Sequence, residues 1–227
     1  MRFAVPIFPG SNCDIDCIKA VEDVLGEPVS PVWHQESDLS GYDAVILPGG
    51  FSYGDYLRSG ALAQFSPIMK GVVKAAQEGK LVIGICNGFQ MLLEMGLLPG
   101  AMLQNDHLKF RCDIQELTVS LNETPFTSLY EQNESIRIPI AHGQGNYFCD
   151  DKTRQELEEH DQIVFRYQGE NPNGSTAAIA GICNRERNVL GMMPHPERAI
   201  VEWMGSVDGV RLFQSMLKHG EENHGAA

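Results

Sequence analysis

Residues 81–94, with the sequence LVIGICNGFQMLLE, place a cysteine between a short apolar run and a helical pattern. The run at 81–85 has the length of a buried strand, and 89–94 has the apolar spacing of a helix. Glycines near Cys86 on both sides permit a sharp turn that other side chains would block. Gly-x-Cys-x-Gly between a strand and a helix is the cysteine form of the nucleophile elbow. A buried cysteine in a glycine-rich turn is the simpler alternative, because cysteine is often buried.

A second segment, residues 192–198 (MMPHPER), strengthens the functional interpretation. A nucleophilic thiol needs a base to take its proton and a third group to orient that base. His195 and Glu197 supply those groups, and side chains at i and i+2 share one side of an extended segment. The prolines around His195 disfavour a helix. We therefore predict a catalytic triad of Cys86, His195 and Glu197, with the last two on extended chain.

The first half of the chain alternates apolar runs with helical patterns. We expect strands at 2–8, 29–33, 43–47 and 81–85, and helices at 13–25 and 60–78. Ser11 or Asn12 is the expected N-cap of the first helix, Gly26 its end, and Pro67 a break in the second. Continuous apolar strands separated by helices indicate a parallel sheet covered on both faces.

The second half shows partial alternation of apolar and polar residues, which is typical of antiparallel strands. We expect strands at 113–121, 136–140, 163–167, 177–183 and 189–193, a closing helix at 208–219, and frayed residues at 221–227. The predicted fold class is α/β, with an open, mostly parallel sheet flanked by helices and antiparallel additions in the second half. We predict one domain over residues 1–227, a length that suits a single α/β unit.

Composition excludes several classes of protein. The net charge is −13 and no run of Lys or Arg occurs, which disfavours nucleic acid and anionic membranes as partners. No apolar run approaches a membrane span, and the first residues resemble a strand more than a signal peptide. Six scattered cysteines fit free thiols in the cytoplasm. Cys13 and Cys17 would share a helix face, but no second ligand pair lies nearby in the sequence, so we predict no metal site.

A Cys-His-Glu set at the end of an open sheet predicts acyl transfer to sulfur. Cys86 would attack a carbonyl, His195 would take the thiol proton and pass it to the leaving amine, and Glu197 would orient His195. The developing oxyanion needs two donors. We expect the backbone N–H groups of Asn87, which follows the nucleophile, and of Gly50 in a glycine-rich loop. A plain tight turn is the alternative explanation of that loop.

Five segments together resemble the class I glutamine amidotransferases, and the resemblance extends over essentially the whole chain. They are 9–14 (PGSNCD), 48–58 (PGGFSYGDYLR), 84–90 (GICNGFQ), 141–143 (AHG) and 191–198 (GMMPHPER). The elbow with the His-Pro-Glu segment specifies the class. The longer segments 48–58 and 191–198 are similar to those of glutaminase subunits that act in purine biosynthesis. The resemblance implies a flavodoxin-like fold.

The resemblance also identifies the substrate as L-glutamine and implies the triad and oxyanion donors named above. Gln90, one helical turn after the nucleophile, would hydrogen-bond the bound glutamine. His142 and Gly143 would contact its amino-acid end. Gln144 departs from the family, which usually has Glu at this position, so we expect no charge-dependent role there.

Ammonia chemistry implies a partner. Free ammonia is mostly protonated in neutral water, and ammonium is not a nucleophile, so we expect ammonia to pass through a shielded route to a second site. The chain has no Gly-x-x-x-x-Gly-Lys-[Ser/Thr] loop for ATP. We therefore expect no cofactor on this chain, with ATP and Mg²⁺ used by the partner. The resemblance implies a large synthetase subunit that amidates formylglycinamide ribonucleotide and a small third subunit.

Residues 51–58 are the candidate partner-sensing element. Tyr53, Tyr56 and Arg58 are residue types enriched at interfaces. A locally packed loop that covers the site is an equal alternative.

Two rival functions remain open. Another elbow-cysteine enzyme, such as a peptidase, a deglycase or a chaperone-like relative, would share the scaffold, but the separation of Cys86 from His195 and the His-Pro-Glu segment fit such an enzyme poorly. A glutamine-sensing binding module would not need all three triad members. Covalent labelling of Cys86 by a glutamine-analogue alkylator would separate these classes.

Overall fold

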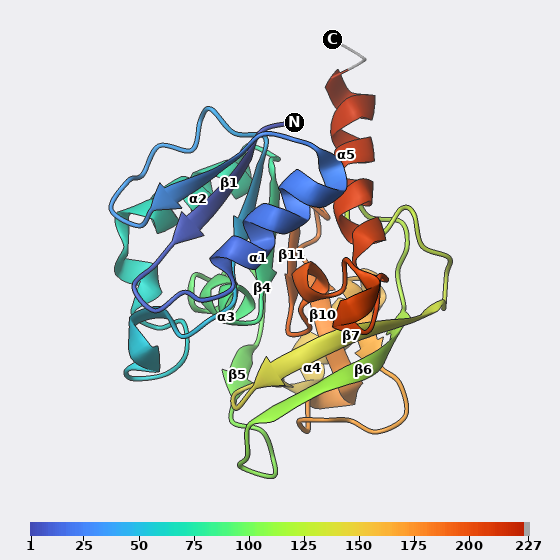
Figure 1. Ribbon diagram of the computed structural model, residues 1–227. Coiled ribbons are helices and arrows are strands. Elements are labelled where there is room, and N and C mark those ends of the chain that lie inside the picture. The colour runs from blue at the N-terminus through green and yellow to red at the C-terminus, as the bar shows by residue number, and fades with distance from the viewer. Residues whose placement is uncertain (225–227) are drawn as a thin grey trace.

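Nine strands join in one sheet, and their order from one side to the other is β2-β1-β3-β4-β11-β10-β9-β6-β7 (Figure 1). The computed structural model describes residues 1–224. β5 (Ala101–Leu103) and β8 (Asn146–Phe148) pair separately. The strands of the large sheet are β1 (Phe3–Ile7), β2 (Val29–Trp33), β3 (Ala44–Leu47), β4 (Leu81–Ile85), β6 (Arg111–Val119), β7 (Ser135–His142), β9 (Ile163–Tyr167), β10 (Ile179–Cys183) and β11 (Val189–Met192).

Helices cover the parallel half of this sheet. α1 (Asp14–Lys19) connects β1 to β2, α2 (Pro67–Gln77) precedes β4, and α3 (Asn87–Glu94) follows it. The connection through α1 leads outward from β1, whereas the connection through α2 leads toward the middle of the sheet. Right-handed connections in opposite directions place their helices on opposite faces, as Figure 1 shows for α1 and α2.

The direction of travel across the sheet reverses at β1. β2 pairs with one side of β1 and β3 with the other, and both pairings are parallel. β4 and β11 extend the parallel half beyond β3. In such sheets ligands bind outside the carboxyl ends of the strands, at the point of reversal. This topology selects one end of the sheet as the place to look for the site.

The fold class predicted from the sequence is confirmed. The continuous apolar runs that predicted the parallel strands correspond to strands that are buried on both faces. All residues of β3 and β4 are buried, because strands covered on both faces bury every side chain. The second half adds β10, β9, β6 and β7 in antiparallel order, as expected from its partial alternation of apolar and polar residues. The strand expected at 189–193 differs, because β11 pairs parallel with β4 and belongs to the parallel half.

Two predictions about the first helices turn out differently. Neither Ser11 nor Asn12 is the N-cap of α1; Cys13 occupies that position and makes no side-chain cap bond. The helix continues as a π-helical segment, Ala20–Leu25, and ends at Gly26 with φ +66° as predicted. The expected break at Pro67 is confirmed, since Pro67 is the first residue of α2, where its missing N–H costs nothing.

The sequence prediction missed β5, β8 and α4 (Asp151–Glu159). α4 is very polar and only Leu157 on it is buried, so no apolar stripe marks it. The available signal was Asp150, whose carboxylate accepts a hydrogen bond from the Thr153 amide at 2.8 Å as an N-cap.

The closing helix α5 (Val210–His224) is longer than predicted. Residues 221–224, expected to fray, belong to it, so that part of the prediction is wrong; residues 225–227 lie outside the described part of the chain. Across residues 1–224, no helix is both long enough and apolar enough to span a membrane.

The turn between β4 and α3 depends on two close approaches. Cys86 has φ +50° and ψ −104°, a conformation that costs a residue with a side chain about 1–3 kcal/mol. A Cβ atom on Gly84 would lie 2.5 Å from the carbonyl oxygen of Gly88. A Cβ atom on Gly88 would lie 2.2 Å from the carbonyl oxygen of Leu47 on β3. Only glycines let the helix lie this close to the sheet.

Gly88→Ala should therefore destabilise the protein by about 1–3 kcal/mol, the usual cost of overpacking, although alanine favours helices. Urea denaturation would measure this loss. Gly41→Ala is the matched control, because the nearest atom to its Cβ would be 4.0 Å away. Equal stabilities for the two variants would contradict the close approach of α3 to β3.

Candidate active site

Four loops meet at the carboxyl ends of the parallel strands. The segment with Cys13 follows β1, Gly49 follows β3, Cys86 follows β4, and His195 follows β11. Their backbones are joined directly: the Cys13 N–H donates to the Gly49 carbonyl at 3.3 Å and the Cys86 N–H to the Met192 carbonyl at 2.8 Å. The sheet therefore gathers residues that are far apart in the chain.

His195 and Glu197 form a buried hydrogen-bonded pair. The distance from His195 Nδ1 to Glu197 Oε1 is 2.6 Å, and the two residues are 1% and 0% exposed. The pair was predicted, but its extended backbone was not borne out: Glu197 lies in a 3-10 turn, Pro196–Arg198, that begins after His195. The His195 N–H donates to the Pro139 carbonyl at 2.8 Å and fixes the start of this turn.

Cys86 and His195 meet across Gly49. A Cβ atom on Gly49 would lie 2.8 Å from His195 Cε1 and 3.4 Å from Cys86 Cβ, so any larger residue would separate the two side chains. Burial by itself would lower the pKa of His195. The Glu197 carboxylate and the negative charge of a Cys86 thiolate outweigh burial and raise the pKa of His195 well above 6.5. The imidazole can therefore hold the proton that the Cys86 thiol gives up.

A cavity of about 150 Å³ opens on the Cys86 sulfur. Four of the residues predicted to contact substrate line it, namely Gly50, Gln90, His142 and Gly143, whereas the Asn87 side chain is buried behind it. The Asn87 amide opens the first turn of α3, where backbone N–H groups have no partner within the helix. The remaining lining residues are Phe51, Asp55, Ser59, Phe110, Ala141 and Gln144.

Gln90 braces the cavity wall. Its Oε1 accepts from Asn87 Nδ2 at 2.8 Å, and its Nε2 donates to the Gln144 carbonyl at 2.7 Å. Asn87 in turn accepts from the Ser52 amide at 3.1 Å. These bonds tie α3 to the loops on both sides of the cavity. The predicted hydrogen bond from Gln90 to glutamine would use the remaining proton or lone pair of its amide.

His142 is held by two asparagines that the sequence prediction missed. His142 Nδ1 lies 3.2 Å from Asn105 Oδ1, and His142 Nε2 lies 3.4 Å from Asn173 Nδ2. Oδ1 accepts and Nδ2 donates, so Nδ1 carries the proton. Asn105 Oδ1 also accepts from the Gly145 amide at 2.9 Å. The ring therefore positions the loop after β7 and has both nitrogens engaged.

Gln144 makes only neutral contacts. Its Oε1 lies 3.4 Å from the Ser59 amide, and its carbonyl accepts from Gln90. An amide at this position can bridge the two loops without a charge.

One part of the loop at residues 51–58 is packed locally. The Tyr53 hydroxyl lies 2.8 Å from His34 Nδ1 and 2.7 Å from Ser66 Oγ. Tyr53 has φ +54°, so these bonds hold it in a conformation that a tyrosine rarely adopts. This part fits the covering-loop alternative.

The other part of the loop is exposed. Tyr56 is 74% exposed and Leu57 84%. Arg58 forms two hydrogen bonds to Glu94, at 2.6 Å and 2.5 Å, which fix the end of the loop on α3. Tyr56 and Leu57 lie in the chain between Asp55 and Ser59, which line the cavity, and they are the part of the loop that fits a partner surface.

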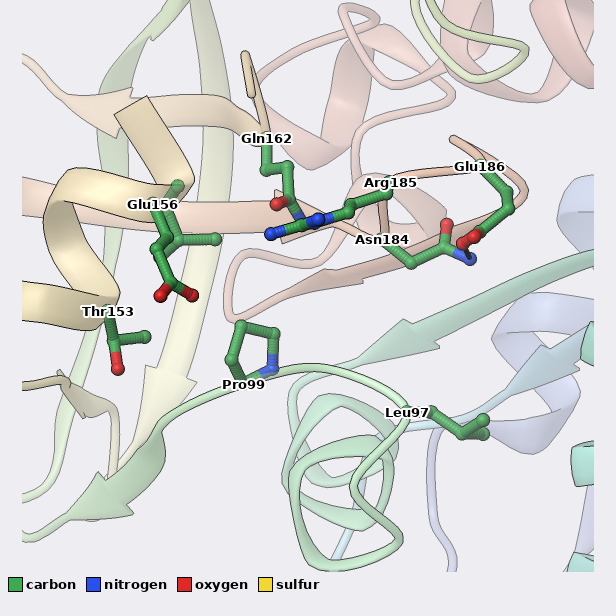
Figure 2. A pocket seen from close by; sticks show the side chains of 9 residues that line it. Leu97, Pro99, Thr153, Glu156, Gln162, Asn184, Arg185 and Glu186 are labelled. Atoms are coloured by element: carbon green, nitrogen blue, oxygen red, sulfur yellow. Dashed lines mark hydrogen bonds between the residues drawn. The ribbon is translucent and has the colours of Figure 1, made fainter. Parts of the chain in front are cut away.

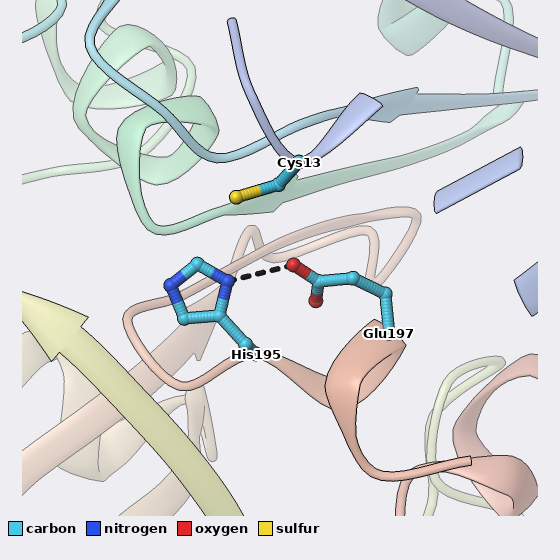
Figure 3. A group of neighbouring side chains, drawn as sticks. All are labelled: Cys13, His195 and Glu197. Atoms are coloured by element: carbon cyan, nitrogen blue, oxygen red, sulfur yellow. Dashed lines mark hydrogen bonds and ion pairs between the residues drawn. The ribbon is translucent and has the colours of Figure 1, made fainter. Parts of the chain in front are cut away.

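Cys13, Asp16 and Arg198 form a cluster that no sequence argument predicted. Arg198 Nε donates to Asp16 Oδ2 at 3.0 Å, and Arg198 Nη2 lies 3.2 Å from Cys13 Sγ. In Figure 3 the Cys13 sulfur lies next to the His195–Glu197 pair. The signal in the sequence was the position of Cys13 after the first strand, at the same end of the sheet as the elbow.

A separate cavity of about 270 Å³ contains no member of the predicted triad (Figure 2). Glu156, Arg185 and Glu186 give it charges of both signs. Its other lining residues are Leu97, Pro99, Thr153, Leu157, Gln162 and Asn184. It is therefore not the place where the Cys86 thiol would meet a substrate.

A histidine and a glutamate two positions apart, after a parallel strand and facing an elbow cysteine, distinguish the class I glutamine amidotransferases from other α/β proteins. The chain has the fold and the side chains of that class. It belongs to the CobB/CobQ-like glutamine amidotransferase family, whose model matches residues 1–219. It is accordingly an enzyme that hydrolyses glutamine.

Solved structures support this membership. A chain in the structure of PurLQS from Thermotoga maritima is 49% identical, with a TM-score of 0.88 over 96% of this chain and 98% of that one. A putative GMP synthase component from Thermoplasma acidophilum is 17% identical, with a TM-score of 0.64 over 99% and 98%. A glutamine amidotransferase from Thermotoga maritima is 14% identical, with a TM-score of 0.58 over 98% and 92%. The last two share the fold.

The His142 network predicts a pH dependence of stability. Burial and, to a smaller extent, the charge on His195 lower the pKa of His142 from 6.5 to about 4. Between these values the unfolded state binds more protons, so the free energy of unfolding falls as the pH drops, by at most about 1.4 kcal/mol per unit. We expect His142→Gln to flatten this dependence between pH 6.5 and 4, as measured by urea denaturation.

His160→Gln provides the control, because His160 is exposed at the end of α4. A wild-type slope that survives in His142→Gln and disappears in His160→Gln would overturn the assignment.

Proposed function

We propose that this chain is the glutaminase subunit of phosphoribosylformylglycinamidine synthase, which converts formylglycinamide ribonucleotide to the amidine in purine biosynthesis. The 49% identity to a chain of PurLQS over 96% of this chain supports the assignment. So do segments 48–58 and 191–198, which resemble such subunits. The observation that carries the glutamine chemistry is the buried His195–Glu197 pair beside Cys86 at the strand ends.

Cys86 acts as the nucleophile in this proposal. Its sulfur attacks the side-chain amide carbon of L-glutamine, and His195 takes the thiol proton. The C–N bond then breaks, His195 passes the proton to the leaving nitrogen, and ammonia and a glutamyl thioester result. Water, deprotonated by His195, attacks the thioester and releases glutamate and the thiol. Glu197 keeps the imidazole oriented and stabilises its charge at each step.

The cavity at Cys86 accommodates the substrate. The backbone amides of Gly50 and Asn87 stabilise the oxyanion of both tetrahedral intermediates. Gln90 hydrogen-bonds the substrate, and His142 and Gly143 shape the wall at its amino-acid end. Support for this placement is that four of the five residues line the same cavity as Cys86.

The acceptor reaction takes place on other subunits. Ammonia passes to a large synthetase subunit, which uses ATP and Mg²⁺, and a small third subunit completes the complex. The glutaminase chain itself needs no cofactor and acts as one domain over residues 1–227. Six free cysteines support a cytoplasmic location, where thiols stay reduced.

Glutamate release from glutamine tests the proposal, measured with and without the synthetase, ATP and formylglycinamide ribonucleotide. Cys86→Ala should abolish release, because no thioester forms. Glu197→Gln should lower the rate at least about 100-fold, because the imidazole loses its orienting carboxylate. Cys112→Ala, which removes an exposed thiol, should retain activity.

Release that persists in Cys86→Ala would overturn the mechanism. Release that needs Cys86 but never responds to the synthetase and its substrates would retain the enzyme class and overturn the purine assignment.

The exposed part of the loop generates a second prediction. Tyr56→Ala should reduce stimulation by the synthetase about tenfold while alkylation of Cys86 by a glutamine analogue proceeds as in wild type, because an exposed aromatic residue at an interface contributes about 1–2 kcal/mol. Phe65→Ala is the control, since Phe65 is 76% exposed and lies outside residues 51–58. Equal stimulation of wild type and Tyr56→Ala would exclude the loop as a partner contact.

A further inference from the structure

The mechanism leaves one buried thiol at the site unused. Cys13 is 2% exposed, and its sulfur lies beside the His195–Glu197 pair rather than in the glutamine cavity. Cys13 Sγ, one ring nitrogen of His195 and one carboxylate oxygen of Glu197 all lie within 4.8 Å of one another (Figure 3). The three atoms come from the loops after β1 and β11, which the sheet brings together.

We propose that Cys13, His195 and Glu197 form an inhibitory zinc site. Thiolate, imidazole and carboxylate are the three donor types that Zn²⁺ takes in proteins, at about 2.3, 2.0–2.1 and 2.0–2.2 Å. A tetrahedral ion with those bonds needs its donors closer together than the present limit of 4.8 Å, so small side-chain rotations complete the site. Three protein ligands leave the fourth position to water.

An unpartnered polar atom supports a ligand at this place. Glu197 Oε2 is buried and has no hydrogen-bond partner within the described residues. A buried carboxylate oxygen without a partner is costly, and a cation bound between carboxylate and thiolate removes that cost. The charges also balance, because one thiolate and one carboxylate neutralise a divalent ion.

Zinc has a route to this site that avoids the glutamine cavity. A second cavity of about 300 Å³ borders His195 and Arg198 and is lined in part by Asp16, Cys112 and Met204. Arg198 lines this cavity, and its Nη2 lies 3.2 Å from Cys13 Sγ. Zinc must displace the positively charged guanidinium of Arg198 from the sulfur. The Arg198 side chain is partly exposed and lines the cavity, so the guanidinium can move into that space.

Bound zinc would inhibit by holding the catalytic histidine. The nitrogen that faces Glu197 is Nδ1, so the ion replaces the proton of the 2.6 Å hydrogen bond between the two side chains. The imidazole then loses its orienting bond and can no longer form a charge-balanced imidazolium. The inhibition rests on the proposed glutaminase function, whereas the binding of zinc does not.

Zinc binding should be measured in the Cys86→Ala background, which removes the nucleophile as an alternative ligand. Competition between the protein and a chromophoric chelator for Zn²⁺ alone gives the affinity. We expect one zinc ion per chain, and a loss of at least about 10-fold in affinity when Cys13→Ser is added. Serine is close to cysteine in size, and a thermal melt checks that the double variant folds.

Two further variants test the location. Cys112→Ala in the same background removes another thiol that borders the cavity and should leave the affinity unchanged. Arg198→Met removes the competing cation and should tighten binding. Cobalt in place of zinc reports the ligand directly: a thiolate-to-metal absorption band should appear in Cys86→Ala and vanish once Cys13→Ser is added.

The results of these experiments distinguish a failure of the zinc site from a failure of the proposed function. Zinc affinity that is lost already in Cys86→Ala places the ion on the nucleophile and overturns the proposal, as does undiminished affinity after Cys13→Ser. In the glutaminase assay, Cys13→Ser should need at least about 10-fold more zinc for half inhibition, each variant being compared with its own zinc-free rate. A chain without glutaminase activity but with Cys13-dependent zinc binding would overturn the proposed function and retain the site.

Discussion

Everything at the active end of this protein depends on how closely helix α3 approaches strand β3. The absence of a side chain at Gly88 allows that approach, the absence of one at Gly84 lets α3 lie close to β4, and Cys86 between them has φ +50°. A strained residue persists only where its surroundings determine it fully. Here the surroundings are a completely buried parallel strand on each side, so the free energy that stabilises the sheet also holds the sulfur in place.

The strand order converts this local constraint into a site. Cys86, His195 and Gly49 belong to loops that follow three parallel neighbours, and a glycine at position 49 leaves room for the other two side chains to meet. The antiparallel half contributes differently. It supplies the wall of the cavity through the loop after β7. The His142 ring positions this loop, and its two nitrogens contact Asn105 and Asn173. One half of the sheet thus presents the reactive groups, and the other half shapes the space in front of them.

The sequence was sufficient for β1 to β4 and for the central side chains, because each has a local signature, whereas β11 was grouped with the antiparallel strands although it pairs parallel with β4. A five-residue apolar run predicts β4, a glycine pair around a cysteine predicts the elbow, and His-Pro-Glu predicts the pair that faces it. The supporting shell has no such signature. Asn105 and Asn173 lie 37 and 31 positions from His142 in the chain, so only the fold reveals that they bind the same ring. The turn at Glu197 was mistaken for extended chain because proline also fits the first position of a 3-10 turn.

The two outermost strands of the large sheet, β2 and β7, have a further consequence for how the molecule behaves in solution. The His34 amide bonds to β1, so alternate amides of β2 face inward and Pro31, three positions before His34, faces outward. Pro139 faces outward on β7, where its carbonyl already accepts the His195 amide. Proline has no backbone N–H, so each edge strand lacks one hydrogen-bond donor that an added strand would need. A second copy cannot extend this sheet with an unbroken ladder, and that protects a concentrated protein from aggregation by strand addition.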